Sequence, residues 1–114
     1  MQSTFPAVSE PGQDWRKALN SRLGLAENVL ATLEVDIDAA MRFRVGGLAL
    51  TDRRLLAWAE GAWTEWPLAP GLALRCADQG GIGTLELLDA HGRLAVWRYT
   101  LAQQAAVLAF AGRF

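Results

Sequence analysis

The side chains of this 114-residue chain that could act as nucleophiles or bases are few and far apart. A hydrolase needs a nucleophile with a neighbouring base, yet the single histidine, His91, falls in the turn-like stretch "DAHGRL". The single cysteine, Cys76, alternates with leucines in "LALRCA", which indicates a small buried hydrophobic residue rather than a reactive thiol. We therefore predict no catalytic residue and no enzyme activity in this chain.

Neither a metal site nor a nucleotide site has a complete set of ligands. Asp36 and Asp38 could hold a cation only with oxygen ligands from elsewhere in the chain. The glycines of "QGGIGTLEL" (79–87) resemble a phosphate-binding loop, but no Lys-Ser or Lys-Thr follows and the next segment has the pattern of a strand. We interpret these stretches as a solvated turn and a hairpin, and expect no metal and no cofactor.

Arginines gather in two short phrases that could bind an anionic lipid headgroup through charge-assisted hydrogen bonds. "RFR" supplies Arg42 and Arg44, and "TDRR" adds Arg53 and Arg54. The acidic stretch 34–38 precedes the first pair, and its carboxylates would repel a phosphate and pair with those arginines across a hairpin. We keep Arg42, Arg44 and Arg54 as candidate headgroup contacts, and the four arginines together as the basis of a membrane-adaptor alternative.

Tryptophan is the most distinctive residue type, because five tryptophans exceed what a core of this size accommodates comfortably. Tryptophan and arginine dominate the binding hot spots of protein interfaces. Trp63 follows the turn at Gly61, and Trp97 is followed directly by Arg98. We predict a candidate interaction surface for a protein partner made of Trp63, Trp97, Arg98 and Arg53.

The overall composition bounds the class of protein. A formal net charge of −1 gives no field toward nucleic acid or an anionic membrane, so nucleic acid is not an expected partner. Residues 1–15 lack the basic and apolar regions of a secretory signal, and the apolar-leaning run 100–112 is too short to span a bilayer. With one cysteine and no internal disulfide, the chain is expected to be a single cytoplasmic domain.

The elements that must position these residues are indicated by periodicity. Residues 1–13 predict a flexible leader, and 14–114 a single domain that begins with a short helix over 14–24, capped by Asp14. A period of two then predicts about seven strands. The alternating segments are 28–38, 41–47, 48–51, 54–60, 63–68, 72–77, 83–89 and 93–100. Within the second of these, Met41, Phe43 and Val45 are expected to lie on one apolar face.

The last segment, 100–114, changes to a helical period. We expect its apolar face to lie against the sheet and Gln103 and Gln104 to lie outside, the face being formed by Leu101, Ala105, Val107, Leu108, Phe110 and Phe114. The fold class is therefore mainly β (α+β), an antiparallel barrel or sandwich with a C-terminal capping helix.

Two phrases in the middle of the chain resemble bacterial PH-like domains. They are "LTDRR" (50–54), a strand end followed by a polar turn, and "WPL" (66–68), the core of a later strand. The resemblance implies a PH-like antiparallel β-barrel, made of two orthogonal sheets and closed by the C-terminal helix. Relatives that bind phosphoinositides carry a basic residue at the end of the first strand, where this chain has acidic residues (34–38).

A longer resemblance covers most of the chain after Glu27. It is carried by "LEVDIDAAMRFRVGGLALTDRRLLA", "WPLAPGLALR", "GIGTLELLD" and "WRYTLA". These phrases are similar to the N-terminal soluble segment of bacterial ABC exporters, with fused permease and ATPase, that are associated with cyanophycin metabolism. The resemblance implies a cytoplasmic domain of an inner-membrane protein, with ATP bound outside this chain. Its expected partner is the rest of the exporter polypeptide or a second copy, as in a homodimer.

The sequence thus predicts a non-enzymatic accessory or regulatory domain that acts through protein–protein contacts. A peripheral membrane adaptor is the first alternative, and it predicts vesicle binding that weakens with salt. A small enzyme or ligand carrier is the second, and it requires a deep pocket lined by converging polar groups.

Overall fold

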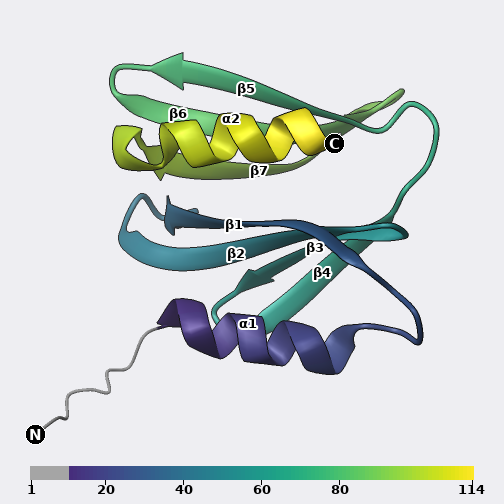
Figure 1. Cartoon of the computed structure of the whole chain (residues 1–114). Coiled ribbons are helices and arrows are strands. Elements are labelled where there is room, and N and C mark those ends of the chain that lie inside the picture. The colour runs from purple at the N-terminus through teal and green to yellow at the C-terminus, as the bar shows by residue number, and fades with distance from the viewer. Residues whose placement is uncertain (1–10) are drawn as a thin grey trace, which may run out of the picture.

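The computed structural model describes residues 11–114, leaving aside the side chains of residues 11–14 and 79. This part of the chain is mainly β, with seven strands in one antiparallel sheet, a short helix before them and a helix after them (Figure 1). The elements are α1 (Pro11–Arg22), β1 (Val29–Ile37), β2 (Phe43–Thr51), β3 (Arg54–Ala59), β4 (Ala62–Pro67), β5 (Ala73–Gln79), β6 (Ile82–Asp89), β7 (Gly92–Thr100), a 3₁₀ turn η1 (Leu101–Gln103) and α2 (Gln104–Arg113).

The sheet has the strand order β4-β3-β2-β1-β7-β6-β5 and divides into two halves. Strands β1 to β4 pair along their lengths, as do β5 to β7, whereas β1 and β7 are joined by the single residue pair Ile37–Arg98. Figure 1 shows the halves as two layers, with α2 beside β5–β7 and α1 on the far side of β1–β4.

The main core lies between the two halves and is filled by alternate residues of the strands, because successive side chains of a strand point to opposite faces. Helix α2 contacts both β1 and β5 and adds Val107 and Phe110 to this core. The buried strand residues are Leu33, Val35, Leu48, Leu50, Leu55, Ala57, Leu85, Leu87 and Tyr99.

A second, smaller core lies between α1 and the outer face of β1–β4. Trp15 is 0% exposed and lies over Gly47, where any larger residue would overlap the indole ring. The indole Nε1 donates a hydrogen bond of 3.0 Å to the carboxylate of Glu34. Leu19 of α1 packs beside it against Leu56 of β3. The half-sheet β1–β4 is therefore covered on both faces.

The N-terminal helix begins earlier than the sequence predicts. It starts at Pro11 instead of Asp14, so residues 11–13 of the expected leader belong to the helix. Proline suits the first helical position, because its missing N–H would have had no partner there. Residues 1–10 of the expected leader lie outside the described residues, as does the capping side chain of Asp14. The segments 41–47 and 48–51 form the single strand β2.

Three of the six residues predicted for the apolar face of the C-terminal helix meet the core. Val107 and Phe110 are buried and Phe114 packs against the core, whereas Leu101, Ala105 and Leu108 are exposed. Gln103 and Gln104, expected to lie outside, are half-buried. The cause is η1, which winds with three residues per turn and so rotates the helix that follows. The core-facing residues then follow a spacing of three to four from Val107.

None of the helices in the described range 11–114 is long and apolar enough to cross a membrane.

The close approach of Trp15 to β2 predicts that Gly47→Ala destabilises the fold by about 1–3 kcal/mol, because the added methyl group displaces the indole ring. Urea unfolding followed by circular dichroism measures the change. Gly112→Ala is the control, since a Cβ at Gly112 meets no atom within 4 Å. Equal unfolding midpoints for Gly47→Ala and the unsubstituted chain would contradict the packing described.

Candidate functional site

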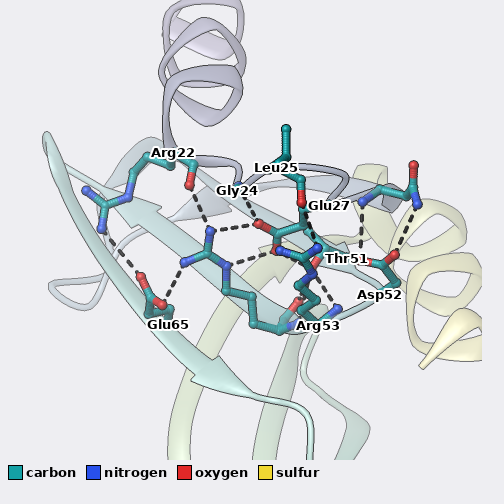
Figure 2. Close-up of polar contacts among 10 residues, drawn as sticks. Arg22, Gly24, Leu25, Glu27, Thr51, Asp52, Arg53 and Glu65 are labelled. Carbon is teal, nitrogen blue, oxygen red and sulfur yellow. Dashed lines mark hydrogen bonds and ion pairs between the residues drawn. The ribbon is translucent and has the colours of Figure 1, made fainter.

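A polar cluster joins the end of α1 to the β2–β3 turn and to β4; we call it the Glu27 cluster (Figure 2). At its centre Arg54 donates two hydrogen bonds to the Glu27 carboxylate, of 2.8 Å from Nη2 and 2.9 Å from Nε. The Thr51 hydroxyl donates to the same carboxylate at 2.6 Å, and the Gly24 N–H at 2.8 Å. Arg54 also donates to Glu65 at 2.7 Å.

The two central side chains of the Glu27 cluster, Glu27 and Arg54, stabilise each other in the charged state. The Glu27 side chain is 1% exposed, yet the hydrogen bonds from Arg54 lower its pKa from the ordinary 4.5 to about 2, outweighing the opposite effect of burial. Hydrogen bonds to Glu27 and Glu65 in turn raise the pKa of Arg54 above its ordinary value. A carboxylate held by four donors is not available to move a substrate proton, so the cluster is a structural element.

The phrase "TDRR" has a clear structural role. The Thr51 oxygen accepts the backbone N–H groups of Arg53 and Arg54, both at 3.0 Å, which closes the turn between β2 and β3. The carboxylate of Asp52 accepts a hydrogen bond of 3.0 Å from the Asn28 amide. Arg53 is exposed and donates to the Leu25 carbonyl at 2.7 Å. Of the candidate headgroup contacts, Arg54 is therefore engaged by two carboxylates instead of facing solvent.

Cys76 and His91, the candidate nucleophile and base, lie in separate parts of the fold. His91 is exposed in the tight turn between β6 and β7, as predicted. Cys76 is half-buried beside the main core, and this burial raises the pKa of its thiol. Within residues 11–114 as described, no group of three His, Cys, Asp or Glu side chains is placed to hold a metal ion.

A cleft opens where the β1–β2 hairpin, the β3–β4 turn and β7 meet; we call it the β7 cleft. Its volume is about 200 Å³, and most of its lining is apolar: Val35, Ile37, Val45, Trp58, Val96 and Trp97. It shares Val45 and Trp58 with a wider hollow of about 520 Å³ that extends to Phe43. The cleft forms because the two halves of the sheet separate beyond the Ile37–Arg98 pair.

The charged groups around the β7 cleft differ in how they are paired. Asp38 forms an ion pair of 3.0 Å with Arg42 and lies 3.7 Å from Arg44, as predicted for this hairpin. The other two carboxylates of 34–38 do not pair with these arginines, because Glu34 contacts Arg16 and Asp36 accepts hydrogen bonds from Thr100. The backbone N–H of Arg42 is the main cause that lowers the pKa of Asp38. Glu60 lies 3.4 Å from Arg44. Arg98 also lines the cleft, but it makes no ion pair with a side chain in the described part of the chain.

The structure does not assemble the predicted interaction surface. Trp63 packs beside α1, where the Arg22 guanidinium lies 5.6 Å from its ring centre. Trp97 packs on the main core, on the opposite face of β1–β4, with its ring edge-to-face to Trp66 at 5.8 Å. Of the four predicted residues, only Trp97 and Arg98 lie together, and both line the β7 cleft.

Two apolar side chains of the face predicted for 41–47 are exposed at the hairpin tip, and Met41 lies in the turn before β2 instead of in a strand. Met41 is 51% exposed and Phe43 85%, whereas only Val45 of the expected apolar face is partly covered. The alternation of residues indicates which side chains share a face, but the β1–β2 hairpin extends past β7, and no described element covers its tip. The turn at Asp38 is the feature that could have indicated a projecting tip.

Comparison of the chain with protein-family models, with curated proteins and with solved structures finds no match.

The low pKa of Glu27 predicts how stability depends on pH. The ionised carboxylate stabilises the fold fully above pH 4.5, and this contribution is lost as the pH falls toward 2. We expect Glu27→Gln to lower the free energy of unfolding at pH 7 by about 1–3 kcal/mol and to flatten its fall between pH 4.5 and 2. Urea unfolding at a series of pH values measures both effects.

Glu60→Gln is the matched control for this prediction, since Glu60 is half-exposed at the cleft rim. We expect its stability to differ from that of the unsubstituted chain by less than about 0.5 kcal/mol. Parallel pH profiles for Glu27→Gln and the unsubstituted chain would contradict the assignment.

Proposed function

We propose that the chain is a non-enzymatic accessory domain that acts through protein–protein contacts as part of a bacterial ABC exporter. The observation that carries this proposal is the β7 cleft, an open apolar depression with Arg98 at its side. Aromatic residues and arginine are the anchors that protein interfaces use most. The polar groups of the Glu27 cluster, by contrast, form hydrogen bonds with one another.

A PH-like architecture is part of the same proposal. Three features support it: the order of seven antiparallel strands, the change of layer at the Ile37–Arg98 pair, and the insertion of Val107 and Phe110 between the two halves. The phrases "LTDRR" and "WPL" add the sequence resemblance. In this arrangement the β1–β2 hairpin, the β3–β4 turn and β7 border one open side of the fold.

The exporter context and its association with cyanophycin are supported by the sequence resemblance after Glu27. The chain would then be a cytoplasmic domain of an inner-membrane protein. Its partner would be the remaining part of the exporter polypeptide or a second copy of this domain.

Photo-cross-linking in cells of the native host tests the proposal on the intact gene product. We expect p-benzoylphenylalanine in place of Ala59, which lines the β7 cleft, to form an adduct with exporter segments or with a second copy. The same substitution at Ala77, exposed on β5, is the control and should form none. A cleft position that forms no adduct, or no more than the control, would contradict the proposal.

A peripheral membrane adaptor is the second candidate, and it is favoured by exposed Met41 and Phe43, which alternate with Arg42 and Arg44 at the hairpin tip. It predicts that the chain co-sediments with phosphatidylserine-containing vesicles, that salt weakens this binding, and that Phe43→Ser abolishes it. Protein docking at the β7 cleft predicts no co-sedimentation with vesicles of either phosphatidylserine or phosphatidylcholine.

A further inference from the structure

The edge of β7 that borders the β7 cleft has little backbone pairing. On its other edge β7 pairs with β6 along nearly its whole length, but toward β1 only Arg98 has a partner, Ile37. The β1–β2 hairpin turns away directly after that pair, because Asp38 accepts two backbone N–H groups of the turn, each at 2.9 Å. Residues 93–97 therefore present a strand edge with unpaired backbone groups, and such edges accept additional strands.

We infer that an extended peptide segment of the exporter polypeptide, from outside this domain, adds to this edge of β7 as a further strand. One apolar side chain of the segment enters the β7 cleft, and one acidic side chain pairs with Arg98. Strand addition of this kind obtains affinity from main-chain hydrogen bonds and specificity from pockets for alternate side chains. The inference rests on the proposed function, since it specifies how the protein contact is made.

The size and lining of the cleft favour a side chain over a whole small molecule. Small-molecule sites usually enclose about 300–1,000 Å³, whereas the β7 cleft itself encloses about 200 Å³. The adjoining hollow of about 520 Å³ is wider, but no residue of β7 lines it. Val96 and Trp97 form the wall on the β7 side, and Val45 and Trp58 form part of the wall contributed by β2 and β3. An aliphatic or aromatic side chain of an added strand would be buried between them.

The hydrogen-bonding capacity of Arg98 favours an acidic partner. The carboxylates of Asp38 and Glu60 at the cleft are engaged by Arg42 and Arg44. The nearby Asp36 is engaged as well, by the backbone N–H and hydroxyl of Thr100. Arg98 makes no ion pair within the described side chains, so its guanidinium keeps its donors for a carboxylate from outside.

The two outer edge strands lack this combination. β4 ends in Pro67, which has no backbone N–H to donate. Neither β4 nor β5 contributes a residue to the lining of the β7 cleft. The apolar pocket, the unpaired edge and the available guanidinium coincide at β7.

A random dodecapeptide library displayed on phage, panned against the full 114-residue chain, tests the inference. We expect enriched peptides that combine a large apolar residue with an acidic one. The most enriched peptide is then synthesised, and its dissociation constant is measured through tryptophan fluorescence, since Trp58 and Trp97 line the cleft. Arg98→Glu should weaken binding about tenfold or more, and replacing the acidic peptide residue by lysine should restore it.

Arg113→Glu is the matched control, because Arg113 also makes no ion pair with the described residues and lies outside the β7 cleft. Its affinity for the peptide should be unchanged. Circular dichroism and thermal unfolding establish that both variants are folded.

Strand pairing itself is tested by N-methylation of alternate peptide residues: one set should abolish binding and the other preserve it. Amide hydrogen exchange within residues 93–97 should slow when the peptide binds.

The inference is overturned if no peptide is enriched, if Arg98→Glu binds the peptide with unchanged affinity, or if both N-methylated sets of peptides still bind. Light scattering that shows a stable dimer of the chain alone, lost in Arg98→Glu, would assign the edge to a second copy. If peptide binding fails while the Ala59 cross-links to the exporter persist, strand addition is wrong and the proposed function stands. If both fail, the proposed function is wrong as well.

Discussion

The ion pair between Glu27 and Arg54 determines how the N-terminal helix meets the sheet. A buried charge pair stabilises a fold only when its remaining hydrogen-bonding groups also have partners, because both ions lose their hydration. Here Thr51, Gly24 and Glu65 provide those partners, and they come from the β2–β3 turn, the α1–β1 loop and β4. One interaction therefore brings three separate parts of the chain into register and holds α1 where Trp15 covers Gly47.

This placement makes the two halves of the sheet chemically different. With α1 on its outer face, the β1–β4 half is apolar on both sides. The β5–β7 half is apolar only toward the core, and its outer face carries an ion-pair network in which Glu86 lies between Arg75 and Arg93. Apolar side chains also remain exposed elsewhere, Leu25 and Leu108 among them, and the apolar β7 cleft lies where the halves separate.

Much of the fold could be predicted from the sequence, because alternation and turn residues are local properties. Leu33 and Val35 point inward as their spacing predicts, and the turn at Thr51 closes through its own hydroxyl group. The helix face could be predicted only in part, since the 3₁₀ turn of three residues rotates the helix and leaves Leu101, Ala105 and Leu108 exposed. The cleft and the exposure of Phe43 depend on the point at which β1 and β7 stop pairing. That point is one contact between residues far apart in the sequence, so no local sequence pattern indicates it.

The arginines show why residue types alone mislead about binding. Arg42, Arg44 and Arg54 stand in phrases that suggest an anion site, yet each is engaged by carboxylates of the same chain. Arg98 also stands out in the sequence, beside Trp97, but only the structure shows that it lines a cleft and has no carboxylate partner among the described side chains.

The joining of the two half-sheets by one backbone pair, Ile37–Arg98, has a mechanical consequence. Thr100 of β7 also donates two hydrogen bonds to Asp36 of β1, so the halves are tied on one side of that pair and open on the other. The backbone ladder therefore fixes where the halves meet but not the angle between them beyond that point. That angle depends on the side chains packed between the halves, which include Val107 and Phe110 of α2.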